Sequence, residues 1–360
     1  MTDNKPKYQV VIDWINEEIA SGRMRIGDRL MPEEKLSKKF GLCRQTIRRA
    51  TSQLVEEKVL TRLQGSGTYV GQILPHTSKK KHMNVAVVST YYNSYIFPPT
   101  LRGIERTLSD TGYAMWLSFT DNRVERERVI LEDILRKSNI DGLIVEAAKG
   151  ALPNPNLSYY KELQKRNIPI IFFNDMYPGL DVPCVRLDDQ CVTYKATKFL
   201  IQSGHKRIAG IFKLDDGQGR RRYSGYIDAL REAEIQLNSR TTIWIDTDSE
   251  LNLWEIEEHL FRRIKGCTGI VCYNDEVAVE VIDLALKRNI KIPQDLSIIS
   301  IDDSELAQMS KVPFTSYSHP KEILGEKTAQ NLLQMIENPA FDGNYLFESQ
   351  AVVRDSIRQI

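Results

Sequence analysis

The sequence contains no long hydrophobic run. No apolar stretch in its 360 residues approaches the ~20 residues of a membrane-spanning helix, and the first ten residues, MTDNKPKYQV, lack the apolar core of a signal peptide. We therefore expect a cytoplasmic protein with no membrane partner.

Cysteine is scarce and irregularly spaced. The five cysteines are odd in number and form no CxxC or Cys/His ligand spacing; they are Cys43, Cys184, Cys191, Cys267 and Cys272. This pattern argues against a disulfide framework and against structural zinc. We expect buried free thiols and no metal site.

Motifs for nucleotide cofactors and covalent catalysis are missing as well. The first apolar run after residue 84 is not followed by GxGxxG, and GxxxxGK[ST] does not occur. The segment 215–225, DDGQGRRRYSG, has no phosphate-loop pattern, and no Ser-His-Asp set with a nucleophile elbow is recognisable. We expect no cofactor and no enzymatic activity; an enzyme remains the rival because doubly wound sheets often bind nucleotides.

Charge is unevenly distributed along the chain. Residues 1–82 carry 16 Lys and Arg against 9 Asp and Glu, a net +7, whereas residues 83–360 carry 33 against 39, a net −6. Because basic segments attract polyanions, this asymmetry predicts that only the N-terminal segment binds nucleic acid.

The first 71 residues show the pattern helix, helix, turn, helix, hairpin. Apolar residues recur at helical spacing from Tyr8 to Ile19 and stop before Ser21-Gly22. PEEKLSKKFG predicts a short helix, CRQTIRRATSQLVEEKVL a longer one, and VLTRLQGSGTYVG two strands around a glycine turn. This order is typical of a winged helix-turn-helix.

The longer helix has the residues of a DNA-reading element. Arg44, Gln45 and Arg48 project from its N-terminal half, where Arg can read guanine and Gln can read adenine. Thr46 is better suited to phosphate, and the glycine-rich wing brings its backbone close to the duplex. An ordinary amphipathic surface helix is the alternative. The candidate DNA-binding residues are Arg44, Gln45, Thr46, Arg48, Arg62, Gln64 and Gly65.

Residues 7–71 resemble the winged-helix domain of the GntR family. The shared features are Gly27-Asp28, Glu33 with Leu36, Arg44 with Thr46 and Arg48, and a wing ending in Gly67-Thr68. The usual Leu-Pro-Ser-Glu is replaced by LMPE, and the usual Ser before Arg44 by Cys43. The second departure removes a hydroxyl that could cap the helix or bind phosphate.

From residue 84 the pattern changes to apolar strands alternating with helices. Runs such as NVAVVST, IPIIFFND and LSIISIDD indicate parallel strands buried on both faces. Four strands end in polar residues, at Glu146, Asn174, Asn274 and Asp302. Because ligands of such sheets bind beyond the carboxyl ends of the strands, we expect these four side chains to line one cleft.

Residues 84–358 resemble the effector domain of the LacI/GalR family, which is similar to periplasmic sugar-binding proteins. The resemblance rests on DGLIVE, LIQSGHKRIAGI, VVRDS and, above all, the stretch 272–307. In this stretch an apolar strand leading into Asn-Asp is followed by a helix, by Ile-Pro-Gln-Asp and by another strand leading into Asp-Asp. A GntR-type domain before such a body is the architecture of arabinose repressors, which the chain resembles from end to end.

This resemblance implies an α/β fold class with an N-terminal winged helix-turn-helix and two doubly wound lobes of the periplasmic-binding-protein type I. The expected DNA-binding domain is 1–72, the linker 73–83, and the effector-binding and dimerisation domain 84–360. The first lobe is expected at about 84–187 and 318–340, and the second at about 188–317 and 341–360.

The same resemblance implies a sugar site between the lobes. Arg222, three residues before Gly225, matches the family's effector-binding arginine, and its neighbours Arg220 and Arg221 are expected at the rim or in solvent. Strand-end side chains, a lysine donor and aromatic side chains that could stack on a sugar ring complete the set. The candidate effector-binding residues are Tyr92, Tyr95, Glu146, Asn174, Lys213, Arg222, Asn274, Asp302 and His319.

Each of these residues has a structural alternative. Asp302 could only cap the following helix, Lys213 could lie on the surface, and the aromatic residues could belong to the lobe core. His205 in SGHKR resembles a structural Gly-His turn and is given no ligand role.

We therefore predict a homodimeric repressor that binds double-stranded operator DNA and is released by L-arabinose. The effector identity comes from the whole-chain resemblance. The alternatives are another sugar or a nucleoside as effector, a ligand that acts as co-repressor, and a sugar receptor without DNA function.

Overall fold

The chain forms two compact units, residues 1–81, here called the head, and residues 82–360, here called the body. The structure, a computed structural model, describes residues 6–57, 59–63, 65–71, 82–92, 95–250 and 252–360. Gln64 and residues 73–81 of the expected linker lie outside the described residues.

The head is a winged helix-turn-helix, as expected. Its helices α1, α2 and α3 and its hairpin strands β1 and β2 span Lys7–Ala20, Glu33–Phe40, Arg44–Glu56, Leu60–Leu63 and Gly67–Val70. The strands pair antiparallel from Leu60↔Val70 to Leu63↔Gly67. Buried residues at helical spacing, among them Val11, Ile15, Leu36, Ile47 and Leu54, form one small core.

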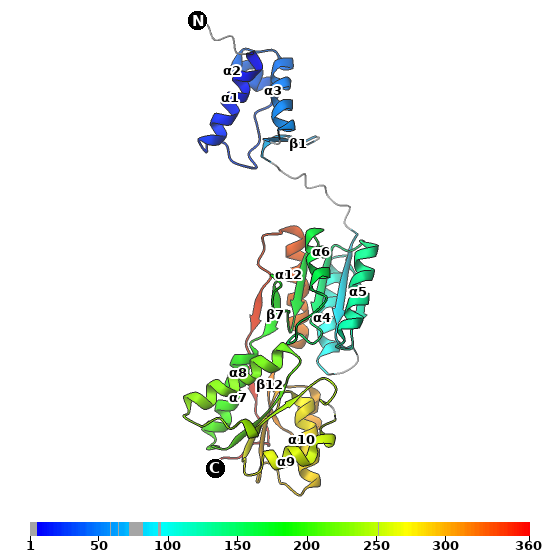
Figure 1. Cartoon of the computed structure of the whole chain (residues 1–360), viewed down its shortest axis with the longest axis vertical. Helices are drawn as coiled ribbons and strands as arrows, with labels where there is room; N and C mark the ends of the chain where they lie inside the picture. The colour runs from blue at the N-terminus through cyan, green and yellow to red at the C-terminus, as the bar shows by residue number, and fades with distance from the viewer. Residues whose placement is uncertain (1–5, 58, 64, 72–81, 93–94, 251) are drawn as a thin grey trace. The chain divides into compact units, whose positions relative to one another are not determined.

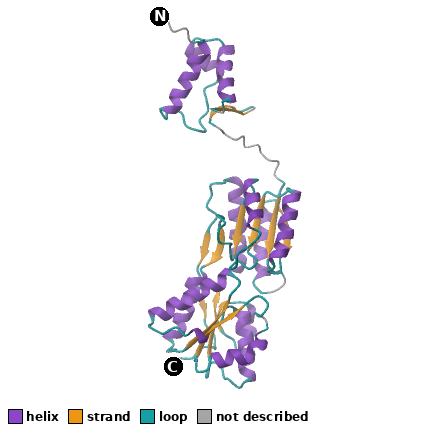
Figure 2. Ribbon diagram, viewed as in Figure 1, coloured by secondary structure: helices purple, strands orange, loops and turns teal. Residues whose placement is uncertain are grey.

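The first lobe of the body is a parallel six-stranded sheet in the order β13-β7-β6-β5-β3-β4. Its helices lie on both faces of the sheet (Figures 1 and 2). Its strands β3 to β7 and β13 span Asn84–Ser89, Ala114–Phe119, Gly142–Glu146, Ile170–Phe173, Cys184–Leu187 and Tyr345–Phe347. Its helices α4, α5, α6 and α12 span Phe97–Asp110, Val124–Lys137, Leu157–Lys165 and Lys321–Glu337.

The central strand β3 shows why helices must cover both faces of the sheet. Val85 and Val87 pack in the cluster that contains residues of α4 and α12, whereas Ala86 and Val88 pack in the cluster that contains residues of α5 and α6. Successive residues of a strand point to opposite faces, so a strand that is apolar throughout requires helices on both sides.

The second lobe repeats this arrangement, with the strand order β14-β12-β11-β10-β8-β9. Its strands β8 to β12 and β14 span Ile208–Lys213, Thr242–Ile245, Gly269–Val271, Ser297–Asp302, Thr315–Ser318 and Ala351–Val352, and only β14 pairs antiparallel. Its helices α7 to α11 span Asp189–Gln202, Gly217–Glu232, Glu257–Arg263, Asp275–Lys287 and Glu305–Met309, with short 3₁₀ turns at Ser239–Thr241 and Leu253–Ile256. The expected fold class of two doubly wound lobes is confirmed.

The chain passes between the lobes three times, after β7, between β12 and α12, and between β13 and β14. The expected assignment of residues 341–360 to the second lobe is wrong in its first part, because Tyr345–Phe347 pairs with β7 in the first-lobe sheet. The third crossing therefore lies between Phe347 and Ala351. Among the described residues, no helix is both long and apolar enough to cross a membrane.

Candidate functional site

In the head, α3 presents a polar face opposite its buried one. Ile47, Ala50 and Leu54 are buried, whereas Arg44 and Arg48 keep 64% and 65% of their side-chain surface exposed. Cys43 precedes the helix without capping it, and its Sγ lies 3.1 Å from Thr46 Oγ1. The exposed face therefore carries the arginines that the sequence assigns to base reading.

Two glutamates at the start of α2 hold these arginines. Arg44 Nη2 lies 3.1 Å from a Glu34 carboxylate oxygen, and Glu33 pairs with Arg48 at 3.0 Å and with Arg62 at 3.5 Å. The ion pairs bring α3 and the wing strand β1 onto one surface, next to the exposed turn at Gly65.

Glu33→Gln is expected to tighten DNA binding, because the carboxylate competes with phosphates for Arg48 and Arg62. An exposed ion pair is worth ~0.2–1 kcal/mol, which predicts an affinity gain of about 1.5- to 5-fold that shrinks as salt rises. Fluorescence anisotropy on one operator fragment at several salt concentrations measures this gain in affinity. Glu17→Gln removes an equal charge from the exposed surface of α1 and serves as the control; equal gains in both variants would contradict a specific role of Glu33.

In the body, a cavity of about 230 Å³ lies between the two lobes. Its walls come from the carboxyl ends of strands and the loops after them, as the rule for open α/β sheets predicts. Six of the nine candidate effector-binding residues line it: Tyr95, Glu146, Lys213, Arg222, Asn274 and Asp302.

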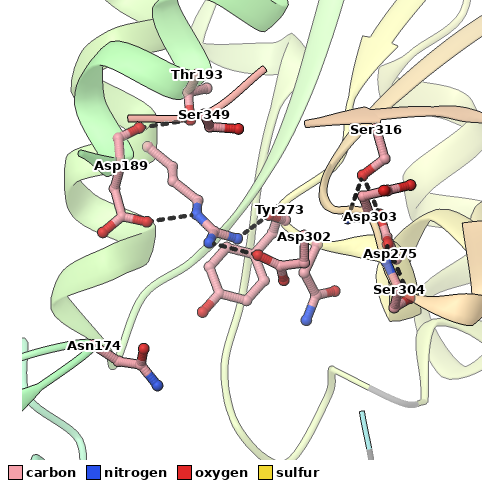
Figure 3. A network of polar contacts seen from close by, with 12 residues as sticks. Asn174, Asp189, Thr193, Tyr273, Asp275, Asp302, Asp303, Ser304, Ser316 and Ser349 are labelled. Carbon is pink, nitrogen blue, oxygen red and sulfur yellow. Dashed lines mark hydrogen bonds and ion pairs between the residues drawn. The ribbon is translucent and has the colours of Figure 1, made fainter. Parts of the chain in front are cut away.

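Among the described residues, Arg222 is the largest fully buried side chain, with 1% of its surface exposed. Its Nε donates to Asp189 at 3.0 Å, its Nη1 to the Tyr273 carbonyl at 2.5 Å, and its Nη2 to Asp302 at 3.1 Å. Figure 3 shows Asp189 and Asp302 on opposite sides of this network with Tyr273 between them. Burial alone would lower the pKa of Arg222, but the charges of Asp302 and Asp189 hold it well above its usual value.

The offset between Arg222 and Gly225 has a steric reason. A Cβ at Gly225 would lie 2.0 Å from the Gln190 carbonyl oxygen, so only glycine lets α8 pack this closely on α7. Asp189 begins α7, and the close approach places its carboxylate within reach of Arg222 one turn earlier on α8.

Tyr95 reaches from the first lobe into the second. Its hydroxyl donates a short hydrogen bond to Asp302 and accepts the backbone N–H of Asp275 at 3.1 Å. Burial and the charge of Asp302 raise the pKa of Tyr95 well above its usual value, so the hydroxyl keeps its proton as a donor.

Lys213 and Asn274 share a carboxylate that sequence reasoning missed. Glu250 accepts from Lys213 Nζ at 2.6 Å and from Asn274 Nδ2 at 2.9 Å. The side-chain oxygen of Asn274 also caps α10, because its Oδ1 accepts the Val277 N–H at 2.9 Å. Although burial would lower the pKa of Lys213, Glu250 and Asp216 hold it above its ordinary value. Lys213 is thus a buried cation, and its surface alternative is excluded.

Glu146 supplies acceptors on the first-lobe wall. It accepts from the Thr90 N–H at 3.0 Å and from Asn174 Nδ2 at 2.8 Å, while burial raises its pKa. Asn174 therefore lies behind the wall as the partner of Glu146 and does not line the cavity, contrary to expectation.

Two further candidates do not line the cavity either. Tyr92 has 54% of its surface exposed and packs on Phe119, whereas the neighbouring Tyr91 lines the cavity instead. His319 is buried beside the second lobe crossing, where burial lowers its pKa to about 3, and its backbone N–H donates to the Asp302 carbonyl at 3.1 Å. The neutral His319 ring does not line the cavity.

Several wall residues escaped sequence reasoning. Asp175 follows Asn174 directly and could have been found as the second polar residue after β6, whereas Glu276 lies two residues after Asn274, in the first turn of α10. Glu250 lies in a loop with no strand-end position, so the sequence held no signal for it. The wall residues not predicted include Tyr91, Asn122, Asp175, Asp216, Thr247, Glu250 and Glu276.

The wall is strongly acidic. Its carboxylates are Glu146, Asp175, Asp216, Glu250, Glu276 and Asp302, against the two cations Lys213 and Arg222. Both cations are already paired with carboxylates. A site with this balance offers many acceptors to hydroxyl groups and disfavours an anionic ligand.

Glu276→Gln is expected to remove a pH dependence of stability. Burial and the charges of Glu250 and Asp302 raise the pKa of Glu276 from 4.5 to about 7. Between these values the folded state binds more protons than the unfolded state, so the contribution of Glu276 to stability is full below pH 4.5 and is lost as pH rises to about 7.

Urea unfolding of both proteins at several pH values tests this sign. The unfolding free energy of the wild type should fall relative to the variant from about pH 5 to pH 7 and run parallel above it. Because the other titrating groups are common to both proteins, a constant difference over this range would contradict the raised pKa.

Comparisons with known proteins agree with both parts of this geometry. Residues 7–70 match the model of bacterial regulatory proteins of the gntR family, and residues 197–357 match that of the periplasmic binding protein-like domain. A crystal structure of the transcription regulator CcpA of Lactococcus lactis is 26% identical and has a TM-score of 0.68, covering 76% of this chain and 99% of that one.

Two relatives are similar over nearly the whole chain. The arabinose metabolism transcriptional repressor of Geobacillus stearothermophilus is 35% identical over 99% of this chain and 98% of its own. The repressor of the same name from Halalkalibacterium halodurans is 36% identical over 97% of this chain and 96% of its own. Since both its gntR-type head and its periplasmic binding protein-like body fall within these alignments, the chain belongs to the family of arabinose metabolism transcriptional repressors.

Proposed function

We propose that this protein represses arabinose utilisation genes by binding operator DNA through its head, and that L-arabinose bound in the body releases it. The observation that carries the proposal is the acidic cavity between the lobes, which is lined by paired acceptor and donor side chains from both of them. The end-to-end similarity to arabinose metabolism repressors supports the identity of the sugar.

The chemistry of the cavity favours a small neutral polyol. Its volume of about 230 Å³ lies below the ~300–1,000 Å³ typical of pockets for drug-sized ligands, which favours a single sugar ring over a nucleoside. Carboxylates such as Glu146 and Glu250 can accept hydrogen bonds from vicinal hydroxyls, and Arg222 and Lys213 can donate to them. The acidic balance disfavours a phosphorylated sugar.

The two-lobed fold provides the link between sugar and DNA. A sugar that contacts both lobes favours their closed arrangement, and in a homodimer held together through the bodies this change alters how two heads meet two operator half-sites. A coupling of ~1–3 kcal/mol would change operator affinity about 5- to 150-fold. The protein would act in the cytoplasm, as a regulator and not as an enzyme.

A gel-shift titration of the full chain tests the proposal. L-arabinose should release the operator, whereas D-galactose and D-ribose at equal concentration should not. Unchanged DNA binding at saturating L-arabinose would refute L-arabinose as the releasing effector, and tighter binding would make the sugar a co-repressor. Isothermal titration against pentoses, hexoses and nucleosides would then identify the ligand.

A further inference from the structure

Three consecutive arginines at the start of α8 make three different sets of contacts. Arg222 stays within the second lobe, whereas Arg220 and Arg221 reach first-lobe groups. Arg220 Nη1 donates to the Ala151 carbonyl at 3.1 Å, and Arg221 Nη2 to the Asn174 carbonyl at 3.3 Å. Arg220 is exposed, as expected, whereas Arg221 keeps 23% of its side-chain surface exposed and has a role in joining the lobes that the sequence did not indicate.

Asp175 is the centre of these contacts. Its side chain belongs to the first lobe and is 4% exposed, with Oδ1 3.0 Å from Arg221 Nη1 and Oδ2 accepting the Gly217 N–H at 2.7 Å. Gly217 is the first residue of α8, so a carboxylate of one lobe binds the N-terminus of a helix in the other, where a negative charge is favoured.

Two glycines shape the space around this carboxylate. A Cβ at Gly217 would lie 2.3 Å from Asp175 Oδ1, and a Cβ at Gly150, in the loop after β5, would lie 2.2 Å from Oδ2. Neither residue has a positive φ angle, so steric room for Asp175 accounts for the absence of a side chain there.

We propose that Asp175, Gly217 and Arg221 form a clasp that holds the closed arrangement of the lobes and thereby sets how long the effector stays bound. The inference rests on the proposed sugar effector. Burial opposes the charge of Asp175 and raises its pKa, so the clasp holds only while Arg221 and the α8 N-terminus compensate that charge. Asp175 acts as a positioning residue: separation of the lobes breaks both of its bonds, and closure re-forms them.

Two single variants break the clasp in different ways. Asp175→Asn removes the charge, whereas Gly217→Ala keeps every charge and fills the space of the carboxylate with a methyl group. Because the sugar enters the open arrangement and leaves the closed one only after the clasp has opened, each variant should accelerate dissociation of L-arabinose by at least about tenfold with little change in association. The double variant should be no faster than the faster single variant, since both remove one interaction.

The control is Arg231→Met, which removes an exposed arginine from the last turn of α8 that pairs with Asp228 of the same lobe. Stopped-flow measurement of L-arabinose dissociation from the full chain gives the rates. Hydrogen exchange of segment 214–222 without sugar gives a second readout, in which both variants should lose the protection of the Gly217 amide and Arg231→Met should retain it.

The outcomes separate the clasp from the proposed function. Dissociation rates within about twofold of the wild type in both variants would overturn the clasp. Faster dissociation in Asp175→Asn alone would overturn it too, because it would assign Asp175 a direct contact with the sugar. If the wild type itself fails to bind L-arabinose, the proposed effector is wrong, and the clasp stands or falls on whether the variants change the exchange of segment 214–222.

Discussion

Arg222→Ala is expected to abolish the response to sugar and to lower the unfolding free energy of the body by about 3–5 kcal/mol, the usual cost of removing one partner of a buried ion pair. Operator binding by the head should persist at temperatures where the body stays folded. This is the largest effect we expect from a single change in the body.

The size of the effect follows from what Arg222 compensates. Asp189 has 0% and Asp302 has 3% of its side-chain surface exposed, and the guanidinium group lies between them. Without it, the buried Asp302 carboxylate loses its compensating cation and the partner that orients it toward Tyr95 and the cavity. Asp189 retains Arg221, whose Nη2 lies 3.3 Å from its carboxylate, but loses the shorter pair with Arg222. The loss of affinity and the loss of stability therefore have one cause.

Arg222→Lys separates charge from geometry. A lysine keeps the positive charge but cannot donate in three fixed directions to Asp189, the Tyr273 carbonyl and Asp302 at once. It should recover part of the lost stability, measured by chemical denaturation of the full chain, and little of the sugar affinity, measured by titration calorimetry. Normal operator release by Arg222→Ala at ordinary L-arabinose concentrations would contradict the assignment.

The sequence was sufficient for the parts of the fold that depend on periodicity. Strands such as 84–89, 170–173 and 297–302 are apolar on both faces, and parallel sheets follow directly from them. The strand 345–347 was not predicted because its apolar run is only three residues long and largely exposed at the sheet edge, so the lobe boundary was misplaced.

The site divides in the same way. Glu146 and Asp302 end strands, Asn274 lies between a strand and the helix that it caps, and Arg222 has a fixed offset from a glycine, so each could be predicted from its local sequence. Tyr91 and Tyr92 are consecutive residues of a loop, so the spacing of apolar residues does not indicate which of them faces the cavity.

Arg221 and Asp175 required the structure for another reason. They lie 46 residues apart on different lobes, and their pairing depends on how the lobes meet. Such a contact has no local pattern in the sequence.

Arg44→Ala is expected to weaken operator binding by about 5- to 150-fold for each head, because a bidentate arginine–guanine contact contributes ~1–3 kcal/mol. Arg44 is the first residue of α3, and it pairs with the exposed Glu34, so it can turn toward a base at small cost. If Arg44 reads a base, the Arg44→Ala protein should bind the operator and an operator changed at that base equally well.

Fluorescence anisotropy at one fixed salt concentration, on the operator, its single-base variants and unrelated DNA, distinguishes base reading from charge attraction. Arg49→Ala is the matched control, since Arg49 lies on the same helix but stacks over the Tyr8 ring of α1, 4.5 Å from its centroid. An equal loss on the operator and on unrelated DNA in Arg44→Ala would assign Arg44 to a phosphate, and base reading would then rest on Gln45 and Arg48. The two outcomes differ because phosphate contacts are the same for every sequence, whereas a base contact is lost at one position only.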